Sequence, residues 1–95
     1  MNALISIGNS DDKLSQAEWS RFIAAIRNVL HSYDDMLTIH GEWFSAPDTP
    51  WQNANWCIEI LDETDLHELR ENLTIVRKHY RQDSIAWTQG PVEFI

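Results

Sequence analysis

The chain has 95 residues, of which 43% are hydrophobic, and its 15 acidic side chains against 7 basic ones give a formal net charge of −8. A chain of this length supports one hydrophobic core and no second domain, so we expect residues 1–95 to form a single domain. The acidic excess, with no stripe of Lys or Arg to offset it, argues against direct binding to a nucleic acid.

The cysteine content and the start of the chain indicate a compartment. Cys57 is the one cysteine, so an internal disulfide is impossible and a reducing compartment is favoured. The first residues lack the basic start and the apolar stretch of a signal peptide, and nowhere do about 18 apolar residues follow one another. We therefore expect a cytoplasmic protein that does not enter membranes.

The first half of the chain predicts a strand, a helix and a second strand. Residues 3–7 alternate in the manner of a strand. Ser15 and Glu18 have the spacing of a capping box, which predicts a helix start at Ser15, and an apolar stripe then continues until the helix ends near residues 32–35. Alternation returns over residues 36–44, which predicts the second strand.

The second half repeats this order. A loop with two prolines over residues 45–55 leads into alternating residues 55–61, which predict a strand hairpinned to the one before. A second striped helix starts at one of two competing N-caps, Asp62 or Thr64, and runs to about residue 81. A last strand begins over residues 84–88 and, with a break at Gly90-Pro91, closes the chain over residues 92–95.

The predicted order of elements is that of a split βαβ, or ferredoxin-like, α+β fold. Right-handed crossovers place both helices on one face of a four-stranded antiparallel sheet, with the first and third strands central. The alternation assigns to the helix-facing side Ile5, Ile7, Leu37, Ile39, Trp43, Trp56, Ile58, Ile60, Ile85 and Trp87. It leaves on the open face Leu4, Ser6, His40, Glu42, Phe44, Cys57, Glu59 and Thr88.

The open face carries the one group of side chains with metal-binding chemistry. His40, Glu42, Cys57 and Glu59 offer nitrogen, oxygen and sulfur donors, but no metal-ligand spacing motif accompanies them, and we expect neither a metal site nor a cofactor. Cys57 stands between Trp56 and Ile58 in a predicted central strand, without the electropositive surroundings of a reactive thiol, and is interpreted as a small buried structural residue. No nucleophile motif or phosphate-binding glycine loop is present, so we expect no enzyme.

The five tryptophans separate into two groups. Trp19, Trp43, Trp56 and Trp87 fit inward positions and are interpreted as core residues. Trp51 lies in the proline-containing loop, where no periodic pattern buries it. It either folds back to cap an end of the sheet or is an exposed anchor for a partner.

Three short motifs carry a resemblance: I-x-I-G before the capped helix with Glu18-Trp19 and Phe22, Gly41-x-Trp43, and Tyr80-x-Gln82-x-Ser84-Ile85 after the second helix. Their linear arrangement resembles small bacterial and phage-associated βαββαβ families of unknown function. In size, acidity and element order the chain is also similar to some bacterial toxin-immunity proteins. The resemblance covers most of the chain as topology and carries over no functional residues. It implies a protein that blocks a partner enzyme by binding it.

These observations predict a small acidic protein-binding module, an inhibitor of the immunity or anti-defence type that acts on a basic, nucleic-acid-acting bacterial enzyme. The expected contacts are Asp48, Trp51, Gln52 and Asn53 in the loop, followed by Asp62, Glu63 and Asp65. The alternative is a homodimeric small-ligand-binding or catalytic domain. Its pocket would lie on the open sheet face among His40, Glu42, Phe44, Cys57 and Glu59.

Overall fold

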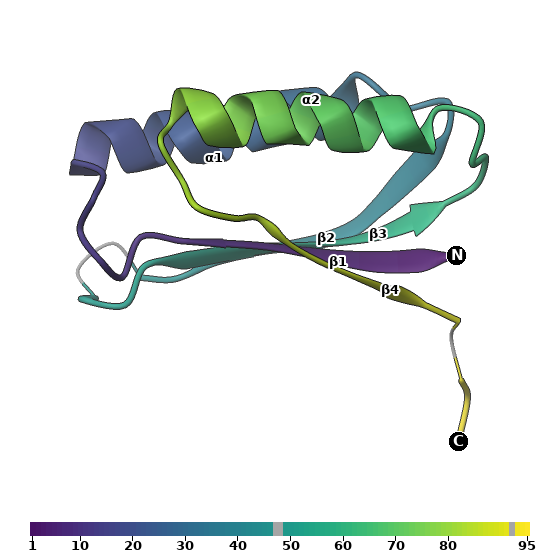
Figure 1. Cartoon of the computed structure of the whole chain (residues 1–95). Coiled ribbons are helices and arrows are strands. Elements are labelled where there is room, and N and C mark those ends of the chain that lie inside the picture. The colour runs from purple at the N-terminus through teal and green to yellow at the C-terminus, as the bar shows by residue number, and fades with distance from the viewer. Residues whose placement is uncertain (47–48, 92) are drawn as a thin grey trace.

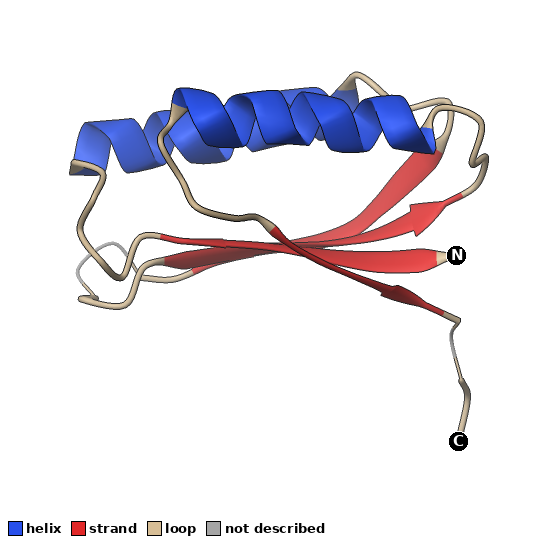
Figure 2. Cartoon of the chain, in the orientation of Figure 1, coloured by secondary structure: helices blue, strands red, loops and turns tan. Residues whose placement is uncertain are grey.

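The computed structural model describes residues 1–46, 49–91 and 93–95 and consists of a sheet with two helices packed on it (Figure 1). The elements are β1 (Asn2–Gly8), α1 (Gln16–His31), β2 (Leu37–Phe44), β3 (Asn53–Ile60), α2 (Leu66–His79) and β4 (Ala86–Gly90). The strands pair antiparallel in the order β2-β3-β1-β4, so β1 and β3 are central. Both helices lie on one face (Figure 2). The predicted ferredoxin-like fold is confirmed.

Helix α1 begins where the capping box predicts. The Ser15 hydroxyl accepts a hydrogen bond from the Glu18 backbone N–H at 3.2 Å, and the Glu18 carboxylate accepts one from the Ser15 N–H at 3.2 Å. Arg81, just after α2, donates to the same carboxylate at 2.7 Å. The Arg81 hydrogen bond, followed by that of the Ser15 backbone, lowers the pKa of Glu18. The cap therefore also joins the start of α1 to the end of α2.

The core lies between the sheet and the helices. Helix α1 buries the stripe Trp19, Phe22, Ile26 and Leu30, and α2 buries Leu69 and Leu73. Ile5, Trp56 and Ile58 of the two central strands meet these stripes with no exposed surface. Amphipathic helices on a half-buried sheet therefore account for the fold.

Strand β2 contains a β-bulge that the alternating pattern did not predict. Ile39 pairs with Ile58, but the next partner, Cys57, pairs with Gly41, so His40 is an extra residue. An extra residue in one strand inverts the alternation of side chains beyond it. Every residue of β2 after the bulge therefore faces the side opposite to the predicted one.

The bulge makes three of the predicted positions wrong. Trp43, predicted in the core, is 55% exposed and lines a hollow of the open face with Leu4. Glu42 and Phe44, predicted on the open face, lie on the helix side, opposite Trp56 and Ala54. Phe44 packs edge-on against Trp56 with ring centroids 6.0 Å apart.

The final strand lies two residues later than predicted. It was expected to begin at residue 84 and to resume after Pro91, whereas β4 covers Ala86–Gly90 and ends before Pro91, which lacks an N–H to continue a ladder, and the described residues 93–95 form no strand. Ile85 and Trp87 are half-buried and pack against the core, as the pattern predicts. No helix within residues 1–46, 49–91 and 93–95 has the length and apolar character required to cross a bilayer.

Truncation of Ile58 tests the assignment of the core. Ile58→Ala removes atoms from a side chain with no exposed surface and leaves a cavity, so we expect the free energy of unfolding to fall by about 2–5 kcal/mol in urea titrations. Ile75→Ala, a control at a side chain that is 63% exposed, changes it by less than about 0.5 kcal/mol. Equal losses in the two variants would contradict the packing described here.

Candidate functional site

A buried amide network fixes the base of the loop that carries Trp51. Asn9 and Gln52 are 0% and 4% exposed, and the Asn9 side-chain amide donates to Gln52 Oε1 at 2.8 Å. The Asn9 backbone N–H donates to the Gln52 carbonyl at 2.8 Å. Gln52 Nε2 donates to Gln16 Oε1 at 2.7 Å, and Asn9 exchanges two hydrogen bonds of 2.9 Å with the Leu14 backbone. The network joins the end of β1, the start of α1 and the start of β3.

Gln52 is therefore a supporting residue that is only 4% exposed, although it also borders a surface groove, and its role as a contact residue stays a prediction. Its polar side chain is buried because Asn9 and Gln16 satisfy its hydrogen-bonding groups. Asn53 remains exposed, and its backbone N–H donates to the Ser45 hydroxyl at 2.9 Å while its carbonyl accepts from the Ser45 N–H at 2.9 Å. Asp48 lies outside the described residues.

Trp51 projects from this fixed base into solvent. Its side chain is 67% exposed, and its backbone N–H donates to the Thr49 hydroxyl at 3.3 Å. Of the two interpretations of Trp51, capping of the sheet end is wrong. The exposed indole is therefore held next to a residue that cannot move without breaking buried hydrogen bonds.

An apolar groove lies beside the base of the same loop. It has a volume of about 240 Å³ and is lined by Gln16, Trp19, Ser20, Ile23, Phe44, Ser45 and Gln52. Phe44 lines the groove because the bulge turned its side chain toward α1, and it remains 42% exposed. The groove and Trp51 share the base of one loop, where Gln52 lines the groove, and we call the two together the Trp51 surface.

The second group of predicted contact residues lies at the end of β3 opposite to the Trp51 loop. Strand β3 begins at Asn53 and ends at Ile60, and its eight residues span about 23 Å. Asp62, Glu63 and Asp65 follow it and are all exposed. The loop residues and these carboxylates therefore do not form one compact cluster.

The turn between α1 and β2 brings further carboxylates to that end. The Met36 carbonyl accepts from the backbone N–H groups of Leu61 and Asp62 at 2.7 and 3.2 Å. The Tyr33 hydroxyl donates to Glu68 Oε1 at 3.0 Å. Six exposed carboxylates gather here, and we call them the acidic end: Asp34, Asp35, Asp62, Glu63, Asp65 and Glu68. Asp34, Asp35 and Glu68 were not among the predicted contacts; Glu68 lies in the first turn of α2, and the fold places the turn that carries Asp34 and Asp35 beside the start of that helix.

Within the described chain, no Lys or Arg forms an ion pair with any residue of the acidic end; Asp34 has only His31 at 3.9 Å. Burial, followed by its hydrogen bond to Glu68, raises the pKa of Tyr33. The hydroxyl and backbone N–H of Thr64 donate to Asp62 and lower its pKa. The acidic end is thus a concentrated negative surface that the protein does not neutralise itself.

The open face brings together three of the five residues predicted for a pocket. His40 Nε2 lies 2.9 Å from Glu59 Oε1, and Cys57 is exposed rather than buried as expected. Two shallow hollows of about 310 and 250 Å³ share Leu4 and Cys57. Glu42 and Phe44 lie on the other side of the sheet, as described above. Among the described residues, no group of three His, Cys, Asp or Glu side chains is placed to hold a metal ion.

Glu42 instead forms hydrogen bonds to a core tryptophan and to α1. Its Oε1 accepts from the indole N–H of the fully buried Trp56 at 2.8 Å and from Arg27 Nε of α1 at 2.8 Å. Partial burial raises the pKa of Glu42, but the hydrogen bonds from Arg27 and Trp56 and the charge of Arg27 outweigh it, and the net pKa is lowered. The carboxylate therefore satisfies a buried donor while remaining ionised.

No protein-family model matches the chain, and no curated protein has significant sequence similarity to it. The assignment of a functional surface therefore depends on the burial, contacts and charges described above.

Loss of the Asn9 side chain tests the amide network. Asn9→Ala removes the side-chain donor to the buried Gln52 Oε1 and both side-chain hydrogen bonds to the Leu14 backbone, so we expect the free energy of unfolding to fall by about 1–3 kcal/mol. Amide hydrogen exchange near Trp51 accelerates in the same variant. Asn28→Ala, at an exposed position of α1, is the control and leaves both measurements near wild type. Wild-type exchange rates in Asn9→Ala would show that the network does not hold the loop.

Substitution of Glu42 tests the link between the core and α1 by its pH dependence. Because the folded-state pKa lies below the ordinary 4.5, ionised Glu42 stabilises the fold above that pH, and the contribution is lost as pH falls through the lowered pKa. We expect Glu42→Gln to be less stable than wild type at pH 7, with the difference shrinking in acid-denaturation experiments below about pH 4.5. Glu63→Gln, at an exposed carboxylate without an ion pair in the described chain, keeps the wild-type profile. A pH-independent difference for Glu42→Gln would contradict this role.

Proposed function

We propose that this domain is a protein-binding module of the immunity or anti-defence type, which inhibits a basic, nucleic-acid-acting bacterial enzyme in the cytoplasm by docking on it. The observation that carries the proposal is the exposed indole of Trp51 on a loop base fixed by buried hydrogen bonds.

An exposed tryptophan on a fixed base has the properties of a binding anchor. Leaving 67% of an indole in water forfeits hydrophobic stabilisation that burial against a partner would recover. Tryptophan is enriched among the residues that dominate binding energy. Because Gln52 already fixes the neighbouring backbone, binding would cost little additional ordering of the chain.

The charge of the domain favours a basic partner. The net charge is −8, and the acidic end concentrates six carboxylates without an ion pair to Lys or Arg in the described chain. Such a field accelerates encounter with positively charged proteins and opposes encounter with acidic ones. Enzymes that bind nucleic-acid backbones present basic surfaces, and an acidic domain competes for them. The similarity to toxin-immunity proteins in size, acidity and element order agrees with this choice.

The two surfaces have different roles in this proposal. Trp51 and the adjacent groove make the direct contact, because they combine apolar area with a fixed backbone. The acidic end, about 23 Å away along β3, steers the approach and selects the partner by charge. Affinity should therefore depend mainly on Trp51, and the association rate and its salt dependence mainly on the carboxylates.

Capture experiments with matched variants test the proposal. We expect wild-type bait to retain a basic nucleic-acid-acting protein from the native host, with activity of the captured enzyme blocked in the complex. Trp51→Ala should reduce retention at least about tenfold, as for the loss of a strong interface residue. Trp43→Ala, which removes an indole of comparable exposure from the open face, should retain the partner protein as well as the wild-type bait does.

Two triple variants, one within the acidic end and one outside it, test the role of the carboxylates. Asp35→Asn, Glu63→Gln and Asp65→Asn together should slow association and weaken its dependence on salt. Asp11→Asn, Asp12→Asn and Glu93→Gln remove the same charge outside the acidic end and should have a smaller effect. Identical capture by wild type and Trp51→Ala would overturn the role of Trp51.

The alternative is a homodimeric ligand-binding or catalytic domain that uses the open face. The two hollows that share Leu4 and Cys57, beside the paired His40 and Glu59, favour it. The same variants distinguish the two functions. If Trp43→Ala abolishes capture or self-association while Trp51→Ala does not, the open face is the functional surface.

A further inference from the structure

Strand β4 is an edge strand without the usual protection against pairing. The sheet order leaves β2 and β4 at the two edges. Strand β2 carries the bulge at His40, a device that commonly protects an edge. Strand β4 pairs with β1 in regular register from Ser6↔Ala86 to Asn2↔Gly90 and contains no charged residue and no proline. Its outer backbone groups are therefore suited to accept another strand.

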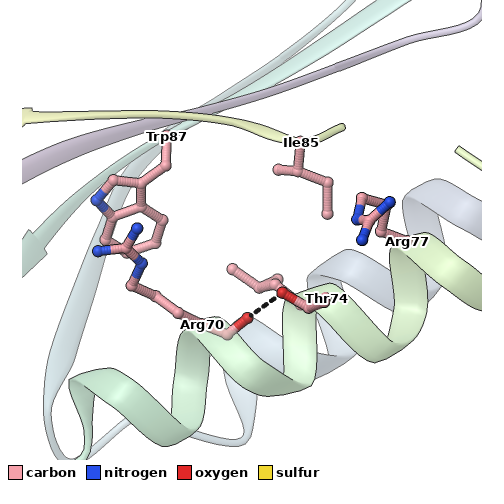
Figure 3. A pocket seen from close by; sticks show the side chains of 6 residues that line it. Arg70, Thr74, Arg77, Ile85 and Trp87 are labelled. Carbon is pink, nitrogen blue, oxygen red and sulfur yellow. Dashed lines mark hydrogen bonds between the residues drawn. The ribbon is translucent and has the colours of Figure 1, made fainter. Parts of the chain in front are cut away.

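A small groove opens beside this edge (Figure 3). It lies between α2 and the chain entering β4 and is lined by Arg70, Leu73, Thr74, Arg77, Ile85 and Trp87. All six residues come from α2 or from residues 85–87, so the groove lies at the margin of the sheet rather than beneath its centre. Its volume is about 120 Å³. That space suits one side chain and is well below the roughly 300 Å³ of an ordinary small-molecule pocket.

The groove is positively charged in an acidic protein. Arg70 lies over the ring of Trp87, with its guanidinium carbon 5.2 Å from the ring centroid (Figure 3). Arg77 Nη1 donates to the carbonyls of Gln82 and Asp83 at 2.9 and 3.2 Å. Neither arginine has a carboxylate partner within the described residues. Two of the seven basic residues of the chain therefore line a groove in which no carboxylate of the described residues pairs with them.

We propose that β4 and this groove form a second binding site, which takes an extended peptide segment of a partner protein carrying one acidic side chain. The peptide backbone pairs with the outer side of β4, and the carboxylate enters the groove beside Arg70 and Arg77. Strand addition supplies affinity through the backbone, and a pocket for one side chain supplies specificity. One acidic residue is favoured over several because the net charge of −8 opposes each further one. The site is separate from the Trp51 surface, so either proposal can fail alone.

Selection from a random peptide library on the whole 95-residue protein tests the site. We expect phage-displayed heptapeptides enriched on the wild type to share one Asp or Glu among β-branched or aromatic residues. Replacing that acid in the synthetic peptide by its amide should weaken binding at least about tenfold, the loss expected for a charged hydrogen bond. This arm leaves the protein unaltered, so unfolding of a variant cannot explain the result.

Protein variants and backbone methylation locate the site. Arg70→Gln should weaken the same peptide at least about tenfold, whereas Arg21→Gln on α1, with no ion pair in the described chain, should not. Because a strand directs alternate N–H groups to its neighbour, N-methylation at one alternate set of peptide residues should abolish binding and at the other should not. Amide chemical shifts should change along β4.

Three results would overturn the proposal. They are the absence of any enriched peptide, selected peptides whose binding does not weaken on loss of the acidic residue or in Arg70→Gln, and amide chemical-shift changes confined to other surfaces.

Discussion

The indole N–H of Trp56 is the constraint on which the arrangement of the sheet depends. Trp56 has no exposed surface, and a donor in such a place must find an acceptor. Glu42 supplies it, and Arg27 of α1 binds the same carboxylate oxygen. Glu42 reaches the core because His40 is an extra residue in β2. One contiguous set of contacts thus joins the centre of the core to an edge strand and to the helix above it.

The same bulge shapes the open face and the groove beside the Trp51 loop. Because it inverts the alternation of β2, Phe44 turns toward α1 and lines the groove beside the Trp51 loop. It also turns Trp43 outward, which gives the open face its largest apolar side chain. The exposure of Trp51 has a separate cause, since buried hydrogen bonds of Gln52 fix the backbone beside it. The bulge in β2 and the buried Asn9–Gln52 pair therefore position Phe44, Trp43 and the base of the Trp51 loop.

The features of the fold that depend on residues close together in the sequence were predicted correctly. The capping box of Ser15, the helix stripes and the succession of strands and helices along the chain were predicted because each needs only residues a few positions apart. The bulge was missed because strict alternation assumes no extra residue, although Gly41 inside a strand is a known sign of one. The burial of Gln52 depends on Asn9, which lies 43 residues away and leaves no periodic signal in the loop. The acidic end was recognised in part, since Asp34 and Asp35 join it only through the fold, whereas Glu68 lies in the first turn of α2 and could have been included from its spacing.

The accessibility of the five indoles to a soluble paramagnetic agent, measured by NMR on ¹⁵N-labelled protein, tests this account most directly. The agent should strongly broaden the indole signals of Trp51 and Trp43, which are 67% and 55% exposed, and leave that of Trp56 unchanged. A protected Trp43 would mean that β2 has no bulge and that Glu42 does not reach the core. A protected Trp51 would mean that the loop folds back and offers no anchor to a partner.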